Sequence, residues 1–247
     1  MPESRSEPEP WRAVAVPAVA ADRLAWITER DMVEVDRVMI DELHIELIQM
    51  MEHAGRHLAR VVREGATPST VVVLAGSGGN GGGGLVAARH LANAGIEVVV
   101  VTTRDRVDMA PVPAHQLDIL ERMGVERRDE PPAGPSVDLV VDAVIGYSLR
   151  GAPRGRSADL IEATVGSPIV VSLDTPSGLD VTTGDAPGRS VAADATVTLA
   201  LPKIGLRHAA AVGELYLGDI SVPPGVTGAY GVAPPPFDAG GLLLVER

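Results

Sequence analysis

From residue 70 onward, short apolar runs alternate with stretches in which apolar residues recur every three or four positions. The run from Val71 to Leu74 contains no polar residue, which is typical of a strand buried on both faces of a sheet. The apolar runs predict strands near 71–75, 97–102, 137–145, 168–173, 195–200 and 214–219. The helical spacing predicts helices near 84–94, 111–123 and 157–165. This alternation predicts an α/β fold, a three-layer αβα sandwich around a Rossmann-like, mainly parallel sheet.

Two further helices are predicted before the first of these strands. Thr28 is a suitable helix N-cap, and Asp31 lies three residues later, as in a capping box. The second helix is expected from roughly Ile45 to Arg63, with Gly65 after it, because apolar residues form one stripe along it. We expect the two helices to cover a face or an edge of the sheet, or to contact a partner subunit.

The two ends of the chain lack this periodicity. Residues 1–24 carry four prolines among charged and small residues, which predicts a flexible N-terminal tail. Residues 25–247 are expected to form a single domain, because a chain of 247 residues with 45% apolar content can bury one large core. The Pro/Gly-rich stretch 222–236 is predicted to be a surface loop.

The stretch between the first strand and its helix is rich in glycine. Seven of the nine residues from Gly76 to Gly84 are glycine, and helical spacing begins after Gly84. A strand, a glycine loop and a helix in this order present free backbone N–H groups at a helix N-terminus, where a phosphate can bind without side chains. This stretch is the predicted nucleotide site.

Polar residues follow several of the predicted strands. They are Asn80 in the glycine loop, Asp142 near the end of its apolar run, Asp174 and Ser177 after the next strand, and Lys203 after the one that follows. Because right-handed crossovers bring the carboxyl ends of parallel strands to one edge of a sheet, we expect these side chains to converge there.

Composition excludes several classes of function. The net charge of −12 opposes binding to nucleic acid, which depends on Lys and Arg contacts to phosphate. The absence of cysteine excludes disulfides, thiolate metal ligands and a thiol nucleophile. No apolar run approaches the roughly 18 residues of a membrane span, and the N-terminus does not resemble a signal peptide. We therefore expect a cytoplasmic protein with no nucleic-acid or membrane partner.

Motifs disfavour three enzyme classes. The glycines match a dinucleotide fingerprint, but the acidic residue expected about 20 positions later would be Asp105, which does not lie at the strand tip. Leu85 stands where a Walker motif requires lysine, so a P-loop ATPase is excluded. Ser177 lacks the surrounding sequence of a hydrolase nucleophile.

The candidate metal ligands favour a monovalent cation. His53 and His57 are four residues apart on the second helix, but no third ligand for a transition metal is indicated. Asn80, Asp142 and Ser177 instead offer hard oxygen ligands at the same edge of the sheet. A cation there would offset part of the negative charge that gathers near an anionic ligand.

Five segments resemble motifs of the YjeF N-terminal domain family, whose enzymatic members are NAD(P)H-hydrate epimerases. They are MMEHAGRHLA, GSGGNGGGGLVAARHL, VVDAVIGYSLRG, SLDTPSGLDVTTG and ADATVTLALPKIGL, and they occur in the family's order between about Arg30 and Pro224. The resemblance implies that the protein interconverts the R and S forms of the hydrated nucleotides NADHX and NADPHX. These compounds would be substrates rather than cofactors.

The resemblance also implies site residues. The nucleotide would be bound by Gly79, Asn80, Gly81, Gly82, Gly83, Gly146, Tyr147, Ser148, Leu149, Arg150, Gly151, Ala152 and Asp174. One potassium ion per subunit would be held by Asn80, Asp142 and Ser177. Asp174 is the expected catalytic residue, because a carboxyl group can move a proton at the substrate hydroxyl or ring. A homodimer through the N-terminal helices is also implied.

The chain departs from the family pattern in its loops. Gly79 and Gly83 replace an asparagine and an aspartate of the family, His53 replaces an asparagine, and Tyr147 and Ser148 replace a Thr-Gly pair. The alternative hypothesis is therefore a diverged member, with altered or lost catalysis, that binds another nucleotide or small molecule or acts as an interaction module.

Overall fold

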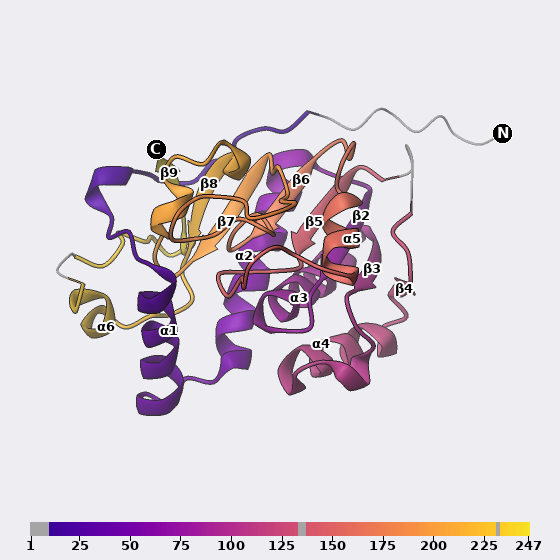
Figure 1. Ribbon diagram of the computed structural model, residues 1–247, viewed down its shortest axis with the longest axis horizontal. Helices are drawn as coiled ribbons and strands as arrows, with labels where there is room; N and C mark the ends of the chain where they lie inside the picture. The colour runs from indigo at the N-terminus through magenta and orange to yellow at the C-terminus, as the bar shows by residue number, and fades with distance from the viewer. Residues whose placement is uncertain (1–9, 133–136, 231–232) are drawn as a thin grey trace.

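The computed structural model describes residues 10–132, 137–230 and 233–247, and in these ranges nine strands form one sheet in the order β1-β9-β8-β7-β6-β5-β2-β3-β4 (Figure 1). The strands are β1 Ala18–Ala20, β2 Thr70–Ala75, β3 Glu97–Thr102, β4 Glu126–Arg128, β5 Leu139–Ala143, β6 Val170–Leu173, β7 Ala195–Leu199, β8 Glu214–Gly218 and β9 Leu242–Glu246. Neighbouring strands are parallel except for β8 and β9, which are antiparallel. The predicted mainly parallel α/β fold is confirmed.

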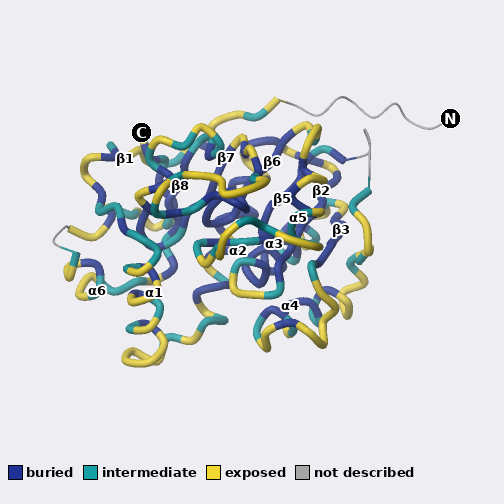
Figure 2. Tube along the Cα trace, in the orientation of Figure 1, coloured by how far each residue is buried: buried dark blue, intermediate teal, exposed yellow. Residues whose placement is uncertain are grey.

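Helices cover both faces of this sheet. The α-helices are α1 Glu29–Arg37, α2 Leu47–Ala66, α3 Gly79–Asn93, α4 Pro111–Arg122, α5 Arg156–Glu162 and α6 Pro224–Gly228. Alternate residues of β2 point to opposite faces, so Val71 and Val73 pack with α2, α3 and α4, whereas Val72 and Leu74 pack with α5. Figure 2 shows the central strands as the most deeply buried part of the chain. No helix in the described part of the chain is both long enough and apolar enough to span a lipid bilayer.

The strand order places a topological switch point beside the predicted nucleotide site. From β2 the chain moves outward to β3 and β4, and then returns to β5 on the opposite side of β2. The crossover connections therefore diverge between the carboxyl ends of β2 and β5. Open α/β sheets bind their ligands in the crevice at such a point.

The two N-terminal helices form as predicted, with small differences at their ends. Thr28 caps α1, and it and Asp31 make both hydrogen bonds of the expected capping box. The chain continues from α1 through one turn of π-helix, Val38–Glu42. Helix α2 does not end before Gly65 as expected, because that glycine lies inside the helix and Thr67 terminates it with a left-handed φ of 44°.

Residues 10–24 do not form the flexible tail that was expected of residues 1–24. Strand β1 pairs with β9, and Val19 is buried. The indole of Trp11 packs against Gly65, where an added Cβ would lie 2.4 Å from the ring, and donates a 2.9 Å hydrogen bond to Glu214. Residues 1–9 lie outside the described residues. A single domain remains our prediction, but it begins well before residue 25.

The glycine-rich stretch is mostly helix rather than loop. Helix α3 begins at Gly79, five residues before the expected start, and the glycines from Gly81 to Gly84 are buried within it. A Cβ on Gly81 would lie 1.8 Å from the Gly76 carbonyl oxygen, and one on Gly84 would lie 2.4 Å from the Ala143 Cβ. These glycines let the helix lie close to the sheet. Because the later N–H groups bond within the helix, only those of its first turn are free to bind an anion.

Candidate functional site

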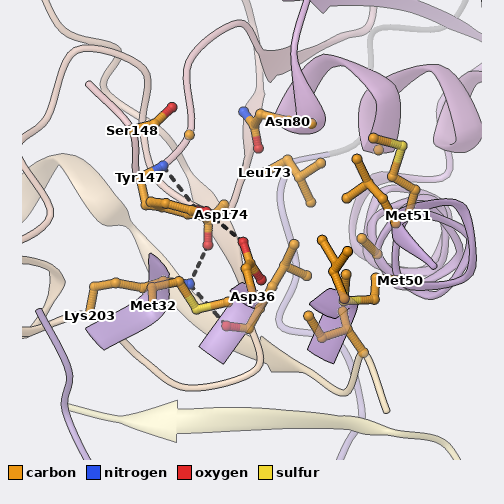
Figure 3. Close-up of a pocket in the computed structure, with 18 residues that line it drawn as sticks. Met32, Asp36, Met50, Met51, Asn80, Tyr147, Ser148, Leu173, Asp174 and Lys203 are labelled. Carbon is orange, nitrogen blue, oxygen red and sulfur yellow. Dashed lines mark hydrogen bonds and ion pairs between the residues drawn. The ribbon is translucent and has the colours of Figure 1, made fainter. Parts of the chain in front are cut away.

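A cavity of about 390 Å³ lies at the carboxyl edge of the sheet, between the ends of β6 and β7, the first turn of α3 and the two N-terminal helices (Figure 3). Its polar lining comes from Asp36, Asn80, Tyr147, Ser148, Asp174 and Lys203. Much of the remaining lining is apolar and includes Met32, Met50, Met51 and Leu173. A largely apolar hollow with a few convergent polar groups is typical of a small-molecule site.

Asp174 is held at the end of β6 in one orientation. Its backbone has φ of +64°, an uncommon conformation for a residue other than glycine, and its side chain is 5% exposed. The carboxylate accepts hydrogen bonds from the Tyr147 backbone N–H at 3.1 Å and from the Lys203 ammonium group. The predicted catalytic carboxylate is therefore positioned before any ligand arrives.

Lys203 is the buried partner of this carboxylate. Its side chain is fully buried, and Nζ donates to Asp174, to the Thr198 hydroxyl at 3.2 Å and to the Leu199 carbonyl oxygen at 2.9 Å. All three ammonium donors are thus used within the protein. The sequence placed Lys203 at this edge of the sheet, but it gave no sign that the lysine pairs with Asp174.

Asp36 is the site residue that sequence reasoning missed. It lies on α1, lines the cavity and accepts a 2.5 Å hydrogen bond from the Tyr147 hydroxyl. Burial raises the pKa of Asp36, and the hydrogen bond from Tyr147 opposes that shift. A signal was present, because Asp36 lies one helical turn after the buried Met32, on the face that points inward.

Tyr147 connects two walls of the cavity. Its hydroxyl contacts Asp36 on α1 while its backbone N–H contacts Asp174. Burial raises the pKa of the Tyr147 hydroxyl, and the nearby Asp36 carboxylate adds to the shift, so the tyrosine acts as a neutral donor. The ring lines the cavity without filling it.

Asp142 and Ser177 lie together beneath the cavity rather than in its wall. The Asp142 carboxylate is completely buried and accepts hydrogen bonds from the Ser177 hydroxyl at 2.5 Å, the Ser177 N–H at 2.8 Å, the Ser172 hydroxyl at 2.8 Å and the Val144 N–H at 3.2 Å. None of these partners is a cation. Burial accordingly raises the pKa of Asp142, although the hydrogen bonds act against the shift.

Asn80 lies at the start of α3 and lines the cavity. Its amide nitrogen is buried and has no hydrogen-bond partner among the described residues. A Cβ on Gly146 would lie 3.1 Å from the amide oxygen, so the loop after β5 packs directly on this side chain. The unpartnered amide nitrogen is a hydrogen-bond donor and cannot ligate a cation, so the oxygen atoms that could hold a monovalent cation are the Asn80 amide oxygen, the Asp142 carboxylate, which has no counter-charge within the ranges described, and the Ser177 hydroxyl.

The structure brings part of the predicted nucleotide-binding set to the cavity. The residues of that set that line it are Gly79, Asn80, Gly83, Gly146, Tyr147, Ser148 and Asp174. Gly81 and Gly82 are buried in α3, and Leu149, Arg150, Gly151 and Ala152 lie outside the lining. The Arg150 guanidinium instead pairs with Glu29 of α1. Which of these residues contact a nucleotide stays a prediction.

Gly79 and Gly83 replace an asparagine and an aspartate of the family, and the space around the two glycines differs. A Cβ on Gly83 would lie 2.7 Å from Cδ2 of Leu173, so a leucine side chain fills the room that an aspartate would need. At Gly79 the nearest atom is Cε of Met51, 4.0 Å away, so that position is open. The loop substitutions change the polarity of the cavity wall but leave the hollow in place.

Comparison with known proteins gives a consistent result. The family described as YjeF-related protein N-terminus matches residues 47–205. An NAD(P)H-hydrate epimerase of Dehalogenimonas lykanthroporepellens is 46% identical over 227 residues, which cover 88% of this chain and 91% of that protein. An NAD(P)H-hydrate epimerase of Truepera radiovictrix is 38% identical over 191 residues, which cover 76% of this chain and 86% of that protein. The crystal structure of yeast YNL200c has a TM-score of 0.78 at 25% identity, over 90% of this chain and 100% of that one.

Proposed function

Because the chain belongs to the YjeF-related N-terminal family, we propose that it is an NAD(P)H-hydrate epimerase, an isomerase that interconverts the R and S forms of NADHX and NADPHX. The observation that supports this most directly is the buried pair of Asp174 and Lys203 at the wall of a largely apolar cavity. The pair offers a buried carboxylate, held in a fixed position, for proton transfer.

The reaction requires proton transfer at the hydroxyl of the hydrated ring carbon. When that hydroxyl takes up a proton it leaves as water, and the lone pair of the neighbouring ring nitrogen stabilises the resulting cation. Water then adds to the same carbon, and a proton is lost again, so atoms and charge balance. We propose that Asp174 moves a proton in this exchange, since its carboxylate points into the cavity. Lys203 would fix the orientation of Asp174.

The remaining cavity residues would bind and orient the nucleotide. The free N–H groups at the first turn of α3, near Gly79 and Asn80, suit its phosphates. The loop from Gly146 to Ala152 would close over it. Met32, Met50 and Met51 would pack on the hydrated ring and exclude bulk water.

We also propose that Asn80, Asp142 and Ser177 hold a potassium ion. The ion would supply positive charge beside the buried Asp142 carboxylate, near the place where an anionic substrate binds. With potassium at ten times its dissociation constant, we expect the melting temperature to rise by about 3–6 °C over that in choline chloride of equal ionic strength. The Asn80→Ala variant should lose this difference, and an equal melting temperature of the wild type in both salts would contradict the proposal.

The activity can be tested with a mixture of R and S NADPHX and a dehydratase that consumes only the S form. The dehydratase alone should stop when the S fraction is exhausted, and addition of this protein should drive consumption to completion. Micromolar nucleotide binding without faster consumption would instead support a diverged binding protein. Absence of both would support an interaction module.

We further propose that the protein acts as a cytoplasmic homodimer. Val33, Ile40 and Leu43, on α1 and the turn after it, are large apolar residues that are 47%, 37% and 44% exposed. A second copy of the N-terminal helices would cover them. Light scattering on the purified protein should give twice the mass of the 25.6 kDa chain, and a monomer mass at micromolar concentration would contradict this proposal.

A further inference from the structure

The cavity contains a second carboxyl group whose surroundings contrast with those of Asp174. Asp174 pairs with the Lys203 ammonium group, whereas the partner of Asp36 is the neutral hydroxyl of Tyr147. Lys203 and Asp174 also act on Asp36 through space, with opposite effects on its charge. Figure 3 shows both carboxyl groups at the cavity, Asp36 on α1 and Asp174 after β6, and Tyr147 contacts each of them with a different end of the residue.

Epimerisation requires proton transfer at both faces of the hydrated ring, which is difficult for a single carboxyl group. The hydroxyl must leave from one face of the hydrated ring, and water must add to the other face. A group on one wall can exchange protons efficiently only at the face that it contacts. A site that treats both epimers as substrates therefore needs an acid or base on each side of the ring.

On the basis of the proposed function, we propose that Asp36 is a second catalytic acid–base residue, which serves the face of the hydrated ring opposite to Asp174. In one direction, Asp36 donates its proton to the hydroxyl, the C–O bond breaks and water leaves. A second water attacks the cation from the other face, a C–O bond forms, and Asp174 takes the released proton. In the reverse direction the two carboxyl groups exchange roles, and before another turnover in the same direction the proton returns from Asp174 to Asp36 through water.

The environments of the two groups fit this division of labour. Burial raises the pKa of Asp36, which favours the protonated form that the first step requires. Asp174 instead forms an ion pair with the Lys203 ammonium group, and an ion-paired carboxylate is the proton acceptor that the second step requires. Carboxyl pairs whose environments differ in this way are typical of acid–base enzymes. Tyr147 fixes the position of the Asp36 side chain and partly offsets the effect of burial.

The Asp36→Asn variant tests the proposal, because an asparagine can still accept the Tyr147 hydroxyl but cannot transfer a proton. We expect kcat to fall by about 100- to 1,000-fold with little change in KM. In the wild type, kcat/KM should fall at alkaline pH, where Asp36 loses its proton. The residual activity of the Asp36→Asn variant should not show this fall. The matched control is Asp41→Asn, an exposed aspartate in the turn after α1, which should keep kcat within twofold.

The Tyr147→Phe variant separates catalysis from a purely structural link between α1 and the loop. Removing a donor to the Asp36 carboxylate should move the alkaline limb of the pH profile to higher pH. If the Asp36–Tyr147 hydrogen bond only held α1 to the loop, the result would be different. Asp36→Asn would keep at least a third of the wild-type kcat, and Tyr147→Phe would lose most of it. That pattern would overturn the proposal, whereas an inactive wild-type enzyme would overturn the proposed function itself.

Discussion

Replacing Asp174 with asparagine is expected to lower kcat/KM for epimerisation by about 10³-fold, within the range found for loss of a general acid or base. The amide keeps the shape of the side chain and can still accept the Tyr147 N–H, but it cannot take up a proton. The measurement is the coupled assay with the S-specific dehydratase, read at several substrate concentrations. A loss smaller than tenfold would contradict the catalytic role of Asp174.

The same variant should also be less stable, and this effect must be separated from catalysis. Lys203 is fully buried, so an uncharged residue 174 leaves its ammonium group without a counter-charge. Breaking one side of a buried ion pair costs about 3–5 kcal/mol. The control is the double variant Asp174→Asn with Lys203→Met, which removes both charges. We expect it to recover much of the lost free energy of unfolding while activity stays low, so that poor folding alone does not explain the kinetic defect.

Local pattern was enough to predict the sheet and the edge at which the site lies. No polar residue interrupts the valine runs of β2 and β3, which is typical of a strand buried on both faces. Once the strands were placed, parallel topology brought Asn80, Asp142 and Asp174 to the same edge. Cavity residues from different strands could therefore be identified without any knowledge of contacts.

Long-range packing explains what the sequence did not show. Trp11 looked like part of a tail because prolines, charged residues and small residues surround it without a clear period, yet its ring packs against Gly65 on α2. Gly81 and Gly84 looked like loop residues because glycine disfavours helices, but contact with the sheet outweighs that preference here. Asp36 was overlooked because its partner, Tyr147, lies 111 residues away.

A similarly large effect on stability is expected from Asp142→Ala, which should lower the free energy of unfolding by about 3–5 kcal/mol. The substitution leaves the buried N–H groups of Ser177 and Val144 without acceptors, and each unsatisfied group costs about 1–3 kcal/mol. It also removes the acceptor of the Ser172 and Ser177 hydroxyls.

A comparison with Asp138 isolates the contribution of burial. Asp138 also accepts two backbone N–H groups, from Ser69 and Thr70, but it lies at a more exposed position before β5. Water can replace its carboxylate, so Asp138→Ala should cost only about 1 kcal/mol. Urea unfolding of both variants, in buffer without potassium, gives the two values directly. If the two costs were equal, burial of the Asp142 network would not be the reason for its contribution to stability.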